Sequence, residues 1–221
     1  MIVIVNYRMG NLRSVAKAFE VMGAEVLVSD KIRDLRQARA IVLPGVGAFG
    51  QGMKHLRELG IIPVLKEEIN KGKPFLGICL GLQLLFTYSE EHGIHRGLNI
   101  IAGKVKSFPK RLKVPHMGWN QVKIQNSKFK IRNLIFAGIP DNSYFYFLHS
   151  YYVVPEDKRI ILATTDYGVK FASLIQKDNI FGVQFHPEKS QELGLKILKN
   201  FLVLSSKYNY VGEKNYTLSG C

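Results

Sequence analysis

The sequence is short of cysteine, of acidic side chains and of long apolar runs. Only Cys79 and Cys221 are cysteines among its 221 residues, which excludes a disulfide-stapled scaffold and favours a reducing, cytoplasmic compartment. No stretch approaches the roughly 20 consecutive apolar residues that a membrane-spanning helix needs. The opening residues, MIVIVNYRMGNL, have neither a basic segment before the apolar one nor a small-residue cleavage site. They therefore predict a first strand rather than a secretory signal.

Acidic residues are outnumbered, since 31 lysines and arginines face 17 aspartates and glutamates and leave a formal net charge of +14. An excess of this kind is typical of nucleic-acid-binding proteins. The basic residues are nevertheless scattered, with the densest runs at residues 31–39 and 104–113, and no zinc-finger spacing, RNP-like aromatic stretch or basic heptad helix accompanies them. The charge therefore indicates solvated basic faces, or attraction to an acidic protein partner or an anionic substrate, rather than binding to nucleic acid or membrane.

The first ninety residues alternate between strand and helix patterns. Buried strands are expected at residues 2–5, 25–28, 40–43 and 75–78, and helices at residues 11–22, 51–59, 63–70 and 80–89. This rhythm predicts a parallel sheet flanked by helices. After residue 98 extended patterns follow one another at residues 100–108, 120–124, 144–154, 160–165, 171–176 and 180–185. A hairpin turn is expected at residues 177–179 and a closing amphipathic helix at residues 191–206.

These patterns predict one α/β domain over residues 1–206, with a mostly parallel central sheet flanked by helices and an added antiparallel region. Residues 207–221 show no periodicity and predict a loose C-terminal tail.

Cys79 lies in a glycine-flanked stretch, GICLG over residues 77–81, where a strand pattern passes into a helical one. A nucleophile on such a sharp turn needs small neighbours, which Gly77 and Gly81 supply. The turn would present the sulfur at the carboxyl end of a strand, where open α/β sheets build their sites, and at a helix N-terminus, which favours the thiolate. A buried packing cysteine between two incidental glycines explains this stretch, taken alone, about equally well.

His186 directly follows the last apolar strand pattern and precedes Pro187 and Glu188. The proline restricts the backbone just after the histidine. Glu188 is near enough to bond one imidazole nitrogen while the other faces a sulfur, which is the nucleophile–base–orienter arrangement of an activated cysteine. A lone histidine after a strand is usually structural, but one followed by Pro-Glu in a chain with an elbow cysteine favours the catalytic interpretation.

A glycine-rich stretch, PGVGAFG over residues 44–50, follows the third strand pattern. Its spacing matches a dinucleotide-binding fingerprint, but that motif belongs to the first strand–helix turn, with an acidic residue at the end of the next strand. We instead expect backbone N–H groups of Gly45, Val46 and Gly47, together with that of Leu80, to face a developing oxyanion. A plain tight turn is the alternative.

Together the motifs at residues 44–47, 77–81 and 186–188 resemble the oxyanion strand, nucleophile elbow and His-Glu pair of class I (triad) glutamine amidotransferases, which have a flavodoxin-like architecture. Within that family, the resemblance narrows to the glutaminase subunits of imidazole glycerol phosphate synthases over roughly residues 1–203. The stretches that carry it are YRMGNL at 7–12, HMGWN at 116–120, HSYY at 149–152 and EKS at 188–190.

The resemblance implies that Cys79 attacks the side-chain amide of L-glutamine and forms a γ-glutamyl thioester, while His186 transfers protons and Glu188 orients His186. It implies neither a metal nor another cofactor. The positions that match the family's substrate-holding residues are Gln83, Glu91, His149, Ser150 and Tyr151. By composition alone, Gln83 and Glu91 would pass as surface residues of an amphipathic helix.

The family's ammonia goes to a (βα)₈ barrel cyclase in histidine biosynthesis. Such a barrel needs about 250 residues by itself, so the resemblance implies a separate partner chain and a heterodimer. The positions that match the interface are Pro115, Met117, Gly118, Trp119, Asn120 and Lys189. A lone tryptophan in a loop is typical of an interface anchor on general grounds. The alternative is a structural role, in which Trp119 covers the edge of the hydrophobic core.

One departure from the family stands at the first loop, which usually reads Asp-Tyr-Gly and here reads Asn6-Tyr7-Arg8. This departure and the basic tail leave open a paralogue that supplies ammonia to a sugar amidotransferase in surface-polysaccharide synthesis. A free-standing γ-glutamyl hydrolase is a second enzyme hypothesis. A basic nucleic-acid-binding module is the non-enzyme hypothesis, and it leaves Cys79, His186 and Glu188 unexplained.

Overall fold

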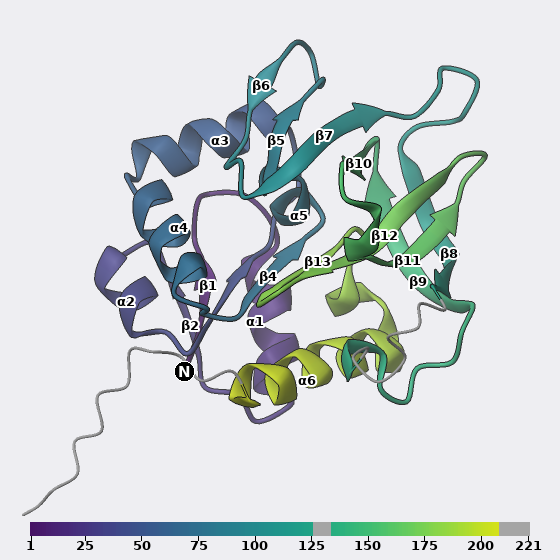
Figure 1. Ribbon diagram of the computed structural model, residues 1–221. Helices are drawn as coiled ribbons and strands as arrows, with labels where there is room; N and C mark the ends of the chain where they lie inside the picture. Colours follow the sequence, from purple (N-terminus) through teal and green to yellow (C-terminus); the bar gives the residue numbers. More distant parts are fainter. Residues whose placement is uncertain (126–133, 208–221) are drawn as a thin grey trace, which may run out of the picture.

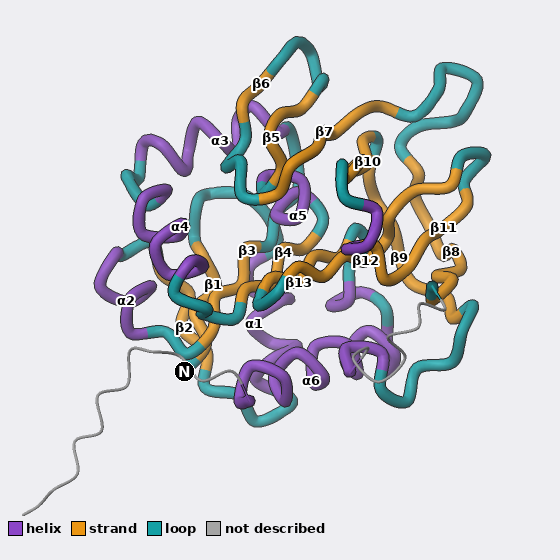
Figure 2. The backbone as a smooth tube through the Cα atoms, viewed as in Figure 1, coloured by secondary structure: helices purple, strands orange, loops and turns teal. Residues whose placement is uncertain are grey.

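The computed structural model of the chain describes residues 1–125 and 134–207, and within them a nine-stranded sheet runs through the middle of the molecule (Figures 1 and 2). Its strands are β1 (Ile2–Val5), β2 (Val26–Ser29), β3 (Ala40–Leu43), β4 (Phe75–Ile78), β8 (His116–Ile124), β9 (Ser143–His149), β11 (Ile161–Asp166), β12 (Lys170–Lys177) and β13 (Ile180–Val183). The spatial order is β2-β1-β3-β4-β13-β12-β11-β8-β9.

Every pair from β2 across to β13 is parallel, and every pair from β13 across to β9 is antiparallel. This confirms the mostly parallel sheet with an added antiparallel region. A second, four-stranded sheet has the order β10-β7-β5-β6. Its strands are β5 (Phe86–Ser89), β6 (His95–Arg96), β7 (Ile101–Ser107) and β10 (Tyr151–Pro155). Most of the predicted tail, residues 208–221, lies outside the described residues.

Helices cover both faces of the large sheet (Figure 1). They are α1 (Leu12–Glu20), α2 (Ile32–Gln37), α3 (Phe49–Glu58), α4 (Ile62–Asn70), α5 (Leu80–Leu84) and α6 (Gln191–Lys207), with short 3-10 turns at η2 (Leu134–Phe136), η3 (Lys158–Ile160) and η4 (Pro187–Lys189). Side chains of β1 alternate between two cores, because Ile2 and Ile4 pack with α1 and α6 whereas Val3 and Val5 pack with α2, α3 and α4.

The helix expected over residues 80–89 is wrong in its second half. Helix α5 ends at Leu84, and Phe86–Ser89 forms β5 instead. Backbone hydrogen bonds from Leu98 to the carbonyl of Leu84 and from Ile100 to that of Leu85 stop the helix, because they use carbonyls that a longer helix would need. Aromatic and β-branched residues in this stretch also favour a strand.

Three further expectations differ from the structure. Trp119, expected in a loop, lies on β8, which begins at His116 rather than at residue 120. The extended stretch expected over residues 144–154 is two strands, since β9 belongs to the large sheet and β10 to the small one. Helix α2 was not expected, because its residues lie in the basic run 31–39. Its C-terminal end is capped from inside by Lys73, which is fully buried and donates to the carbonyls of Leu35 (2.8 Å) and Arg36 (2.7 Å). Lys73 also pairs with buried Glu68 at 2.7 Å.

Candidate active site

Cys79 follows β4 directly and occupies a sharp turn into α5. Its φ of 53° lies in the left-handed region, which is unusual for a residue with a side chain and marks a strained position. The flanking glycines are required by close approach, since a Cβ on Gly77 would lie 2.8 Å from the Gly81 carbonyl oxygen and one on Gly81 would meet the Leu43 carbonyl oxygen at 1.7 Å. The turn is therefore a nucleophile elbow. Helix α5 has only five residues, so its dipole is weaker than the sequence led us to expect.

His186 lies close to Cys79 because β13 is the parallel neighbour of β4, with Val183 opposite Ile78. Its Nδ1 bonds Glu188 Oε1 at 2.8 Å, and both side chains are almost fully buried. Burial alone would lower the pKa of His186, but the adjacent Cys79 and then Glu188 outweigh it and raise that pKa above its ordinary value. His186 Nε2 has no partner of hydrogen-bond geometry among the described residues.

The glycine-rich stretch runs beside the elbow, and Val46 and Gly47 line the same pocket as Cys79 and Leu80. The N–H of Leu80 donates to the carbonyl of Gly45 at 3.3 Å, so in this conformation it is not available to an oxyanion. Gly47 has a φ of +105°, which glycine adopts more easily than residues with a side chain.

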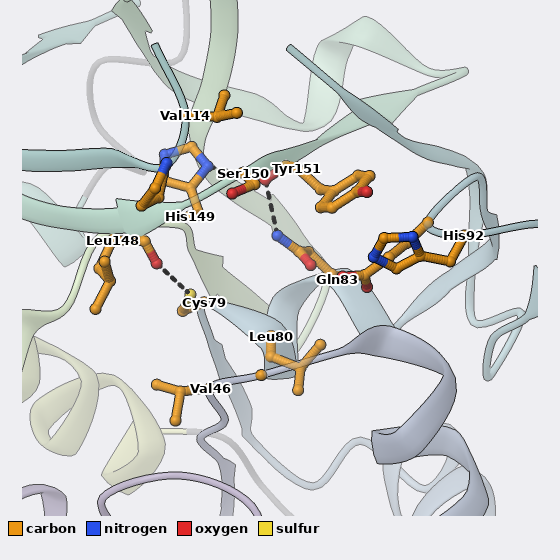
Figure 3. Close-up of a pocket in the computed structure, with 13 residues that line it drawn as sticks. Val46, Cys79, Leu80, Gln83, His92, Val114, Leu148, His149, Ser150 and Tyr151 are labelled. Atoms are coloured by element: carbon orange, nitrogen blue, oxygen red, sulfur yellow. Dashed lines mark hydrogen bonds between the residues drawn. The ribbon is translucent and has the colours of Figure 1, made fainter.

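A pocket of about 460 Å³ opens beside Cys79 (Figure 3). All the residues expected to hold substrate line it, namely Gln83, Glu91, His149, Ser150 and Tyr151. The sequence did not single out His92, Val114 and Leu148, which also line it. The Cys79 thiol donates to the Leu148 carbonyl at 3.7 Å. Figure 3 shows this bond on one side of the pocket and the bond between Gln83 and Tyr151 on another.

Glu91 has a second contact besides the pocket. Its Oε2 accepts from the backbone N–H of Phe49 at 2.6 Å, the first residue of α3. A carboxylate in this place satisfies an otherwise unpaired donor at a helix start. Glu91 therefore links the pocket wall to the end of the glycine-rich stretch, although it lies on the turn after β5 rather than just beyond a long helix.

The polar side of the pocket is ordered by hydrogen bonds that converge on the carbonyl oxygen of Tyr151. This oxygen accepts from Gln83 Nε2 at 2.9 Å and from His149 Nδ1 at 2.8 Å. Because His149 Nδ1 must carry the proton, His149 Nε2 accepts from His116 Nδ1 at 3.0 Å. Burial lowers the pKa of His149 to about 3, against the opposing bond to Tyr151, and lowers that of His116 to about 4. Both imidazoles are therefore neutral at physiological pH.

The residues expected at a partner interface occupy two settings. Pro115 lines the pocket, whereas Met117 and Trp119 on β8 are 65% and 47% exposed. The Trp119 ring stands edge-on to that of Tyr146, and Lys189 Nζ lies 5.7 Å from the centre of the Tyr146 ring. The other two lie on the same strand: Asn120 bonds the Asp166 carbonyl at 2.9 Å, and Gly118 has a φ of 132°. An exposed aromatic and thioether surface thus adjoins the pocket mouth.

Two buried polar residues near Cys79 were given no role from the sequence. Gln184 is fully buried and donates to Cys79 Sγ at 3.6 Å. The sequence feature that could have identified Gln184 is a polar glutamine inside the apolar strand pattern IFGVQF. Tyr7 is also fully buried, and its hydroxyl lies against Gly45 without a hydrogen-bond partner in the described part of the chain. Burial and then the neighbouring Cys79 raise the pKa of Tyr7 well above its usual value.

Within residues 1–125 and 134–207, no three His, Cys, Asp or Glu side chains are grouped so as to hold a metal ion. In the same residues, no helix has the length and apolar character to cross a membrane.

A family model for "Glutamine amidotransferase class-I" matches residues 3–204. Among curated relatives, the imidazole glycerol phosphate synthase subunit HisH of Aquifex aeolicus is 54% identical over 90% of this chain and 94% of its own length. The subunit of the same name from Geobacter sulfurreducens is 50% identical over 90% and 97%.

Solved structures with the same fold share far less sequence. A crystal structure of a glutamine amidotransferase superposes with a TM-score of 0.72 at 18% identity, covering 92% of this chain and 98% of that one. PurLQS from Thermotoga maritima gives 0.68 at 21% identity, covering 92% and 97%.

Proposed function

The chain belongs to the class I glutamine amidotransferases, an enzyme family, and on this premise we propose that it is the glutaminase subunit of an imidazole glycerol phosphate synthase. The observation that carries the proposal is the strained elbow cysteine, adjoined by a buried His-Glu pair and opening into a pocket of about 460 Å³. A pocket of this size accommodates a small amino acid such as L-glutamine. The names of relatives about 50% identical support the choice of synthase.

The proposed reaction divides glutamine hydrolysis into two steps. Cys79 transfers its proton to His186 Nε2, and the thiolate attacks the side-chain carbonyl carbon of L-glutamine. His186 then returns the proton to the leaving nitrogen, which departs as ammonia and leaves a γ-glutamyl thioester. A water deprotonated by His186 attacks the thioester, and glutamate leaves as the sulfur regains its proton. Glu188 keeps His186 Nδ1 protonated and stabilises the imidazolium.

The oxyanion of each tetrahedral intermediate needs hydrogen-bond donors. We propose that the peptide between Gly45 and Val46 rotates before catalysis, because its carbonyl occupies the Leu80 N–H at 3.3 Å. Rotation would free that N–H and turn the Val46 N–H towards the pocket. One donor of this kind is worth about 10²–10³ in kcat, so the conformation described here predicts slow hydrolysis by the chain alone.

The proposed partner is a separate cyclase chain with a (βα)₈ barrel, to which the ammonia passes. The surface formed by the exposed Met117, Trp119 and Lys189 and the half-buried Tyr146 supports a docking site there, since aromatic and thioether side chains are typical of interface centres. The backbone carbonyl of Tyr146 also accepts from the N–H of His186 at 2.8 Å, so docking on this surface would act next to the proposed base. A reducing, cytoplasmic location is proposed because the reaction depends on a free thiol.

The test is glutamate release by the purified chain, alone and with a purified barrel cyclase carrying its ribotide ligand. We expect slow release alone and a stimulation of about 10²-fold or more by the loaded cyclase. Cys79→Ser should abolish release in both settings, whereas Trp119→Ala should reduce only the stimulation. Full activity of the isolated chain would favour a free-standing γ-glutamyl hydrolase. Stimulation by a sugar amidotransferase but not by the cyclase would favour the paralogue.

A further inference from the structure

Gln184 lies between the nucleophile and the polar wall of the pocket. It follows β13 directly, its side chain is fully buried, and its amide bridges two groups from α5 and the elbow. Its Nε2 donates to Cys79 Sγ at 3.6 Å, and its Oε1 accepts from Gln83 Nε2 at 3.2 Å. A buried amide whose two ends meet a reactive sulfur and a pocket-lining side chain is placed to affect both.

The direction of this amide follows from the Tyr151 carbonyl. A carbonyl oxygen only accepts, so Gln83 must turn its NH₂ group towards Tyr151, at 2.9 Å. The same NH₂ group faces Gln184, which must therefore present its oxygen to Gln83. The opposite orientation of Gln184 would bring its NH₂ group against that of Gln83 and leave the Gln184 NH₂ without an acceptor there. The NH₂ group of Gln184 is thus held towards Cys79 Sγ by a chain of bonds that begins on the backbone.

We propose that Gln184 is a further catalytic residue, whose side-chain NH₂ stabilises the thiolate of Cys79 and whose carbonyl keeps Gln83 oriented in the pocket. The proposal rests on the function proposed above and adds a residue to it. When Cys79 gives its proton to His186, its sulfur changes from a weak hydrogen-bond acceptor into a charged one. A donor already directed at the sulfur binds this charged form more strongly than the thiol. Since Gln184 is uncharged, this stabilisation adds no second buried charge beside His186.

The same bonds connect the sulfur to the substrate wall. Gln83 shares its NH₂ group between the Tyr151 carbonyl and Gln184, and both Gln83 and Tyr151 line the pocket. A substrate that takes a hydrogen bond from Gln83 would therefore alter the same network that holds Gln184 against Cys79. Loss of Gln184 is expected to lower the reactivity of the Cys79 sulfur more than it lowers the affinity for substrate.

The experiment measures alkylation of Cys79 by iodoacetamide against pH, in the full chain carrying Cys221→Ser so that only Cys79 reacts. Two variants remove the donor: Gln184→Met preserves the length and flexibility of the side chain, and Gln184→Asn keeps an amide that is one methylene too short to reach the sulfur. We expect both to move the pH midpoint of alkylation upward by about one pH unit, with rates at neutral pH about tenfold lower. With the cyclase present, kcat should fall by a similar factor and KM should change less.

The control is Gln125→Met. Gln125 also donates its side-chain NH₂, to Thr164 Oγ1 at 2.7 Å and to the Lys123 carbonyl at 3.3 Å, but it directly follows β8 and has no contact with Cys79 among the bonds of the described residues. Its alkylation profile should match that of the parent. Unchanged profiles in Gln184→Met and Gln184→Asn, with folded far-UV signals, would overturn the proposal. Shifted profiles in a chain that never hydrolyses glutamine would uphold the role of Gln184 and refute the proposed function.

Discussion

The contact between Gly45 and Tyr7 offers a sharp test of how the glycine-rich stretch is held. A Cβ on Gly45 would lie 2.0 Å from the Tyr7 hydroxyl oxygen, 3.2 Å from the ring carbon that bears it, and 3.0 Å from Leu80 Cβ. The backbone at Gly45 is not in the left-handed region, so the cost of Gly45→Ala comes from this collision alone. Overpacking in a core costs about 1–3 kcal/mol. We expect the upper end, because Tyr7 is fully buried and its backbone carbonyl is held by His55 Nδ1 at 3.1 Å.

Tyr7→Phe should repair much of this damage. It removes the oxygen at 2.0 Å, and the next nearest atoms, at 3.0 and 3.2 Å, are at distances that small shifts can absorb. It also removes a buried hydroxyl with no partner in the described residues, so on its own it should be neutral or slightly stabilising. The double variant should therefore be more stable than the sum of the two single changes by about 1 kcal/mol or more.

The assay is urea unfolding of the parent, both single variants and the double variant, followed by far-UV circular dichroism. Gly52→Ala is the matched control, since a Cβ there would meet its nearest atoms at 3.4 Å, an ordinary contact. If Gly45→Ala is as destabilising in the Tyr7→Phe background as in the parent, the hydroxyl is not the obstacle, and the reasoning from this contact is wrong.

Three other outcomes are expected. Between about pH 6.5 and the folded pKa values of about 4 and about 3, the free energy of unfolding should fall as pH falls, because the unfolded chain protonates His116 and His149 while the folded chain keeps them neutral. Urea titrations should show a shallower fall in His116→Phe, and equal slopes would contradict this origin. Glu188→Gln should lower kcat for glutamine hydrolysis by at least about tenfold with little change in KM, measured with the cyclase present; an unchanged kcat would remove Glu188 from the mechanism. Lys73→Met should cost about 3–5 kcal/mol in thermal or urea unfolding, because it breaks the buried pair with Glu68, whereas a loss under about 1 kcal/mol would show that the pair is dispensable.

The parallel half of the fold was predictable because each buried strand is a continuous apolar run bounded by turn residues. The boundary between α5 and β5 was not, since the apolar spacing after Leu80 suits a helix as well as a strand. What decides it are hydrogen bonds from Leu98 and Ile100, which are distant in sequence. Local patterns carry no information on such partners.

The candidate site divides in the same way. Cys79 and His186 could be found because each carries a local signal at a strand end, a glycine pair in one case and Pro-Glu in the other. Gln184 could not be given a role, because its importance comes from an amide direction set by Tyr151 and Gln83. The state of the Leu80 N–H likewise depends on the backbone conformation of Gly45, which composition leaves open.

The placement of β13 beside β4 also bears on how the chain is made. Gln184 stands 105 positions after Cys79 in the sequence, and the two meet only once β13 has paired with β4. A ribosome releases the N-terminal half first, so the nascent chain carries its cysteine through the next 105 residues of synthesis without the amide and imidazole that would activate it. On the proposed mechanism, the thiol therefore gains its activating partners only after β13 has been made and has paired with β4. Truncated chains ending before β13 would then be harmless to the cellular glutamine pool.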